Sequence, residues 1–158
     1  MDTRKIDRAL WTENDFEEMN WHDNKIYAIS FLKEENQISF DIDYILEWIE
    51  QKKKKSCFKF LIVPATLVFR NVYEFSMSLS LVDITIDSIY RNNPTKPKNA
   101  AHIVDQIEYD WVIETTNGEI VFKSVGYKQY ARQKPRLNEN QSIGFFERGG
   151  ISFDKVGF

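Results

Sequence analysis

The sequence reads FKFLIVPATLVF from Phe58 to Phe69, and this run is the strongest strand signal in the chain. Short apolar runs rich in aromatic and β-branched residues are typical of buried strands. Pro64 lies inside the run and has no main-chain N–H, so it requires a sheet edge, a bulge or a break between two strands. The run therefore predicts a β-protein with an irregularity at Pro64.

The residues before this run predict a hairpin and then become ambiguous. Alternating residues from Lys25, a polar break at residues 33–37 and a second alternating run over residues 38–43 indicate two paired strands. From Asp41 to Lys55 the alternation can continue, but apolar residues also recur with helical spacing from Asp43. We favour a strand that turns into a short helix ending at Lys52–Lys55.

The remainder of the chain predicts further short elements. Asp15 and Thr12 form a potential capping box for a short helix within Ala9–Asn20. Asn117-Gly118, between alternating apolar runs, predicts a tight hairpin with positive φ at both residues. The other expected segments are strands at residues 73–81, 84–90, 103–115, 119–125 and 127–131, loops at 91–99 and 132–141, and a last strand near 143–147.

These elements predict a single, mainly β domain covering residues 1–158. Eight to ten antiparallel strands with one or two short helices fit a sandwich or a sheet curled into a partial barrel, with an α+β fold as the alternative. The chain has 12 Phe, 7 Tyr and 4 Trp, and aromatic residues favour half-buried pleated surfaces.

The composition disfavours several classes of protein. A net charge of −3 and a pI of about 5.5 are untypical of a nucleic-acid-binding domain. The longest apolar stretch, from Phe60 to Phe69, is much shorter than the roughly 20 residues that span a membrane. Cys57 is the only cysteine, and we expect it at a buried or half-buried strand position. The polar residues 1–5 lack a secretory signal, so we expect a cytoplasmic protein.

The first candidate site is the tetrapeptide Trp21-His22-Asp23-Asn24. Adjacent His and Asp residues occur in metal-dependent phosphohydrolases, but such sites need further histidines and this chain has only His102 besides His22. A metal site of His22, His102 and one of the three aspartates Asp23, Asp41 or Asp43 is the alternative. We favour a structural role in which Trp21 fills the core and the polar residues bind main-chain groups at a corner.

The second candidate is the pair Asp41 and Asp43, which share a face if their segment is a strand. Paired carboxylates can perform acid–base chemistry or hold a hard cation. A solvated strand face and a helix cap at Asp43 are the alternatives. The candidate polar site is therefore His22, Asp23, Asp41 and Asp43, and we assign no catalytic residue, metal or cofactor.

The run Lys52–Lys55 has two interpretations. It could contact phosphate, but we expect no aromatic residues beside it and favour a solvated helix end.

Three motifs carry a resemblance to a known family. WHDN at residues 21–24, DIDYIxxW at 41–48 and PATLVF at 64–69 resemble a family of small bacterial proteins of unknown role. That family is loosely similar to the immunity proteins that accompany polymorphic toxins, and the resemblance covers roughly residues 11–90. It implies a bacterial cytoplasmic protein without assigning chemistry to any residue.

Two functions remain open from the sequence. The first is a non-enzymatic binding protein with a protein partner, resembling a toxin immunity protein, since aromatic anchors dominate interface energetics. The second is a small-molecule or metal-binding protein, or a hydrolase, with its pocket at the candidate polar site. Because the familiar catalytic motifs are absent from the sequence, we favour the first.

Overall fold

The computed structural model describes residues 7–156 and 158, with residues 54–56 described by their backbone alone. Within this part of the chain, ten strands form one antiparallel sheet that does not close, in the order β1-β9-β4-β3-β2-β6-β7-β8-β5, with β10 also paired to β4. The strands are β1 (Leu10–Thr12), β2 (Lys25–Leu32), β3 (Gln37–Gln51), β4 (Lys54–Arg70), β5 (Tyr73–Leu79), β6 (Ile84–Thr95), β7 (Glu108–Thr115), β8 (Gly118–Ser124), β9 (Gly126–Ala131) and β10 (Arg136–Asn138). The 3₁₀ helices are η1 (Glu13–Glu18), η2 (Lys33–Glu35) and η3 (Ala100–His102).

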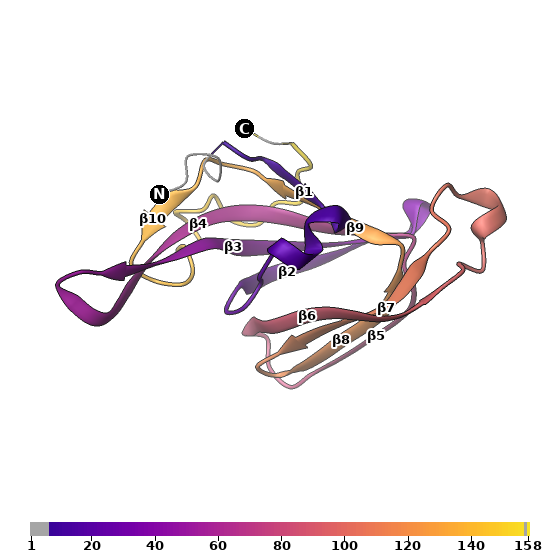
Figure 1. Cartoon of the computed structure of the whole chain (residues 1–158), viewed down its shortest axis with the longest axis horizontal. Coiled ribbons are helices and arrows are strands. Elements are labelled where there is room, and N and C mark those ends of the chain that lie inside the picture. Colours follow the sequence, from indigo (N-terminus) through magenta and orange to yellow (C-terminus); the bar gives the residue numbers. More distant parts are fainter. Residues whose placement is uncertain (1–6, 157) are drawn as a thin grey trace.

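The sheet folds over on itself between β2 and β6. These two strands share only the pairs Lys25–Thr85 and Ile26–Ile84, so the half that contains β3 and β4 turns to face the half that contains β7 and β8 (Figure 1). The mainly β, curled antiparallel fold expected from the sequence is confirmed.

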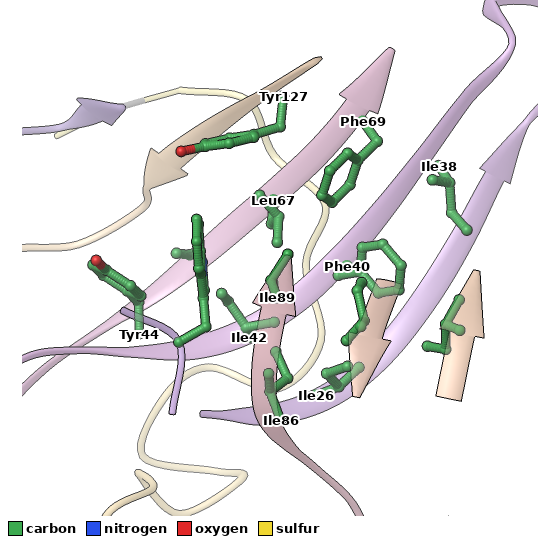
Figure 2. Close-up of a cluster of buried hydrophobic side chains, with 14 of the residues drawn as sticks. Ile26, Ile38, Phe40, Ile42, Tyr44, Leu67, Phe69, Ile86, Ile89 and Tyr127 are labelled. Atoms are coloured by element: carbon green, nitrogen blue, oxygen red, sulfur yellow. The ribbon is translucent and has the colours of Figure 1, made fainter. Parts of the chain in front are cut away.

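The hydrophobic core fills the space between the two halves. Ile38, Phe40 and Ile42 alternate along β3 and point into it, as the period-two pattern predicts, and Leu67 and Phe69 of β4 join them (Figure 2). These five side chains are at most 1% exposed. The core is therefore built around the hairpin of the two longest strands.

The opposite face of β3 and β4 is covered by the C-terminal segment, residues 139–156 (Figure 1). Ile143 packs there against Ile45, Phe60 and Ile62 in a second, smaller cluster. The long hairpin is thus covered on both faces near its base, while its tip projects beyond the rest of the sheet (Figure 1).

The expectation of a helix from Asp43 is wrong, because β3 continues as a strand to Gln51. Its residues pair with β4 along this length, including Asp43 with Pro64 and Trp48 with Phe60. The lysine run consequently lies at the turn of this hairpin and not at a helix end. Long-range pairing with β4 decides a segment whose local pattern fits both structures.

Pro64 does not break β4, because it lies between the partners of one edge of that strand. On the edge that does not pair with β3, β10 pairs with residues 60–62 and β9 with residues 65–70. The Pro64 carbonyl accepts a hydrogen bond from the Arg132 N–H at 3.0 Å in the gap. The missing donor of proline is accommodated at this local edge.

Several other boundaries differ from the expectation. The predicted last strand near residues 143–147 is wrong, since that segment forms irregular turns, and β6 extends to Thr95 through the expected loop. Cys57 is exposed and not buried. At the N-terminus the helix is the 3₁₀ element η1, and the predicted capping box of Thr12 and Asp15 is confirmed.

The β7–β8 hairpin allows a direct test of the fold at Gly118. The turn is formed by Thr116 and Asn117, and of the two residues expected at positive φ only Gly118 has it, at 135°. A Cβ at this position would lie 1.9 Å from the Ser78 carbonyl oxygen of β5. We therefore predict that Gly118→Val lowers the free energy of unfolding by about 2 kcal/mol or more, from main-chain strain and overlap together.

Urea denaturation measures this loss, with Gly144→Ala as the control. A Cβ at Gly144 makes ordinary contacts of 3.7 Å or longer, so the control should change stability by less than about 0.5 kcal/mol. Equal stability of the two variants would contradict this account of the hairpin.

Candidate functional site

Asp41 and Asp43 lie next to each other on the face of β3 that the C-terminal segment covers. Side chains two residues apart along a strand point to the same face, so the continuation of β3 brings the two acids together. Both side chains are completely buried. The expected shared face is confirmed, whereas a solvated face and a helix cap are wrong.

Arg148 of the C-terminal segment lies between the two carboxylates. Its Nε donates to Asp43 Oδ1 at 3.0 Å, and Nη1 and Nη2 donate to the two oxygens of Asp41 at 2.9 and 2.6 Å. The two remaining N–H groups donate to the carbonyls of Gly150 and Ile42 at 2.5 and 3.2 Å. All five guanidinium donors therefore have an acceptor, although the side chain is fully buried.

A second arginine balances the charge of this cluster. Arg132 Nη2 donates to Asp41 Oδ1 at 2.7 Å, and its Nη1 donates to Thr66 Oγ1 at 2.9 Å. The Ser152 N–H donates to Asp41 Oδ2 at 3.0 Å. Two carboxylates thus face two guanidinium groups, which avoids the penalty of several kcal/mol for an unpaired buried charge.

Tyr27 closes the cluster on the side of Asp43. Its ring centroid lies 3.8 Å from Cζ of Arg148, and its hydroxyl lies 2.9 Å from Asp43 Oδ2 and 2.5 Å from the Ile143 carbonyl oxygen. Burial, followed by the neighbouring Asp43 carboxylate, raises the pKa of Tyr27 well above its usual value. The phenol therefore keeps its proton and donates it to one of these two acceptors at a time.

The oxygens of both carboxylates are already used. Asp41 accepts from two arginines and one main-chain N–H, and Asp43 accepts from Arg148, Tyr27 and the Ile143 N–H. Among the described residues, no group of three or more His, Cys, Asp or Glu side chains could hold a metal ion. The pair acts as the anchor of the C-terminal segment.

The WHDN motif forms a corner that joins the two halves of the sheet. Trp21 is 3% exposed, and its indole N–H donates to Gln129 Oε1 at 2.8 Å. The Asp23 N–H donates to the Ile86 carbonyl and the Ile86 N–H donates to the Asn24 carbonyl, both at 2.8 Å. These bonds attach the corner to β6.

His22 and Asp23 lie at the surface of this corner. His22 Nδ1 is 3.0 Å from the Asp87 carbonyl oxygen, and Nε2 is 3.5 Å from Asp23 Oδ2. Asp23 Oδ2 also accepts from Gln141 Nε2 at 2.8 Å. Both imidazole nitrogens therefore face oxygen atoms of the protein.

The four candidate residues form two pairs. No hydrogen bond or ion pair within the described part of the chain joins His22 or Asp23 to Asp41 or Asp43. His102 lies on η3 at an exposed position.

A groove of about 720 Å³ opens beside the His22–Asp23 corner. The His22 ring stacks on Trp48 with centroids 6.3 Å apart, and Gln141, the partner of Asp23, lines the groove. We call it the hairpin groove, and it is lined by Trp48, Gln51, Lys53, Cys57, Phe58, Lys59, Phe60, Glu139 and Gln141.

Three aromatic side chains form an edge-to-face row in the hairpin groove. The Trp48 ring lies 5.7 Å from that of Phe58 and 5.1 Å from that of Phe60. A bulge at Leu46 shifts the alternation of β3, so that Trp48 shares a face with Phe60. Trp48 and Phe58 are 41% and 40% exposed, whereas Phe60 is 7% exposed.

The sequence interpretation missed this row. It expected no aromatic residue beside the lysine run, which is wrong, because the hairpin brings Trp48 and Phe60 together across the turn. Lys53 and Lys59 line the same groove, and among the described residues Glu139 is the one acidic residue in its lining. The alternation that continues through residues 41–48 is the sequence signal that predicts this aromatic row, because a strand there pairs with the run from Phe58.

No protein-family model, no curated protein and no solved structure matches this chain. Within the described residues, no helix has both the length and the apolar character needed to cross a membrane.

Substitutions of Trp21 and His22 test whether the corner has a structural or a chemical role. Because Trp21 is buried and His22 has a side chain that is 52% exposed, we predict unequal losses of stability. Trp21→Ala should cost about 3–5 kcal/mol, and His22→Ala about 1 kcal/mol or less. Two-state urea denaturation of both variants measures this, and a loss at His22 as large as that at Trp21 would contradict the assignment.

Proposed function

We propose that this chain is a non-enzymatic binding protein of the bacterial cytoplasm, and that the hairpin groove docks a protein partner. The observation that carries the proposal is the pair of exposed rings, Trp48 and Phe58, on the two strands of the β3–β4 hairpin. The tip of this hairpin projects beyond the rest of the sheet (Figure 1).

Aromatic residues at such a position suit an interface. Tryptophan is enriched among the residues that dominate binding energies, and such residues pack in pockets that exclude water. The Trp48 ring packs edge-to-face on the buried Phe60 ring and stacks with the His22 ring, so packing holds it in place. The Trp48 ring is therefore already in position before the partner binds.

The charges of the groove indicate the partner's chemistry. Lys53 and Lys59 outnumber Glu139 among the groove residues, although the whole chain carries a net charge of −3. Complementary charge favours an acidic rim around an apolar patch on the partner.

The alternative, a small-molecule or metal-binding protein or hydrolase, has less support. Asp41 and Asp43 are occupied by arginine and main-chain donors, and both nitrogens of His22 face protein oxygens. A general base or a metal ligand needs a free lone pair directed toward its target.

Two further observations support the cellular setting and class of partner. Cys57 is the only cysteine and its thiol is exposed, as suits a reducing compartment. The resemblance of the three motifs to relatives of polymorphic-toxin immunity proteins favours a toxin as the partner. In this chain WHDN forms the corner at β6, DIDYIxxW carries the two aspartates that bind Arg148, and PATLVF forms part of β4.

Affinity capture from a lysate of the encoding bacterium, read by mass spectrometry, tests the proposal. Trp48→Ala and Phe58→Ala should each weaken the captured partner's binding about 30-fold, as expected for a hot-spot loss of roughly 2 kcal/mol. Phe31→Ala is the matched control, because its ring is 62% exposed and lies outside the groove. Equal loss with the control, or a retained metabolite in place of a protein partner, would contradict it.

A further inference from the structure

A second cleft, of about 460 Å³, lies where η1 meets the ends of β6 and β7. Arg91 of β6 is half-buried there, with Cζ 4.5 Å from the ring centroid of Phe16, 4.4 Å from that of Tyr109 and 5.6 Å from that of Trp111. The cleft is lined by Glu13, Asn14, Arg91, Val104, Asp105, Gln106, Ile107, Tyr109 and Val125.

We infer that this cleft binds a carboxylate group carried on a short apolar chain, with Arg91 as the residue that recognises the carboxylate. This ligand site is separate from the hairpin groove and does not depend on the function proposed for it.

The hydrogen-bond donors of Arg91 are unused within the described part of the chain. The Arg91 guanidinium donates no hydrogen bond to any residue that the structure describes, whereas Arg132 and Arg148 both donate to protein oxygens. Stacking on aromatic rings fixes the position of the guanidinium and uses none of its five N–H groups. A carboxylate can accept two of them in parallel.

The charges around the cleft indicate the charge of the ligand. Glu13 and Asp105 also line the cleft, but Arg70 binds both of them, at 2.8 and 3.3 Å. The charges of these two acids and of the two arginines sum to zero, so an anion with one negative charge at Arg91 gives a net charge of only −1. A phosphate dianion would bring the net charge of this cluster to −2 and a monocarboxylate only to −1, which favours the monocarboxylate.

Apolar side chains line the same cleft as the Arg91 guanidinium. Val104 and Ile107 are 94% and 55% exposed next to Arg91 in the same cleft. A concave site with an apolar wall and few converging polar groups is typical of sites for small ligands. An aliphatic chain attached to the carboxylate would cover these two side chains.

Two sources could supply this chemistry, a free aliphatic acid or the C-terminal carboxylate of a peptide with an apolar last residue. NMR titration of the whole chain distinguishes them, with hexanoate for the first and N-acetyl-leucine for the second. N-acetyl-leucinamide is the matched control, since it lacks only the carboxylate, and inorganic phosphate tests the preference for a monoanion.

We expect saturable shifts of the Arg91 Nε–Hε signal and the Val104 methyl signals with at least one carboxylate, and none with the amide. Arg91→Lys should weaken binding about 10-fold because lysine keeps the charge and loses the paired donors. Arg136→Lys, whose guanidinium contacts the Glu147 carbonyl outside the cleft, should leave binding unchanged.

If Arg91→Lys disturbs the aromatic core, Val104→Glu provides the second variant, because this exposed position tolerates a charge that should repel the ligand. The inference is overturned if neither carboxylate gives a saturable shift at millimolar concentration. It is equally overturned if the amide or phosphate binds as tightly as the carboxylates, or if Val104→Glu leaves binding unchanged.

Discussion

The ion pair between Arg148 and the two aspartates of β3 determines how the long hairpin is covered. One face of β3 and β4 packs into the apolar core, but the other presents two carboxylates that cannot be buried alone without a large penalty. Arg148 supplies the charge and all five donors, and in doing so fixes the otherwise irregular C-terminal segment on that face. A buried ion pair of this kind is costly to break, yet it adds little net stability over well-packed apolar residues. Its main contribution here is to specify where the segment docks.

Because Arg148 binds both aspartates, a functional site has to lie elsewhere on the molecule. Both candidate sites of the sequence are used to build the fold: Asp41 and Asp43 bind the C-terminal segment, and the WHDN corner joins the two halves of the sheet at Ile86. Trp48 and Phe58 of the same hairpin keep about 40% of their surface exposed, in a groove that Glu139 and Gln141 of the C-terminal segment also line. A binding role at the tip and a structural role at the base of the same hairpin are therefore consistent with each other.

The sequence predicts the strands well wherever the pattern is local. Period two over residues 38–43, the apolar run of β4 and the Thr12–Asp15 capping box all appear in the structure. The failures involve long-range contacts. Residues 43–51 fit a helix equally well until β4 pairs with them, and the role of Asp41 depends on an arginine 107 positions later in the chain. Arg148 lies in an irregular segment, where no periodicity indicates which face it covers.

A double-mutant cycle between Asp41 and Arg148 tests the anchor most directly. The free energy of unfolding would be measured by urea denaturation for Asp41→Asn, Arg148→Met and the double variant. Each single change leaves a buried polar group without its partner, so the double variant should be less destabilised than the sum of the two, with a coupling energy of roughly 1–3 kcal/mol. Native-state hydrogen exchange should at the same time show loss of protection at the Ile143 and Ser152 amides, which donate to the two aspartates. Additive losses within about 0.5 kcal/mol, with both amides still protected, would contradict the account.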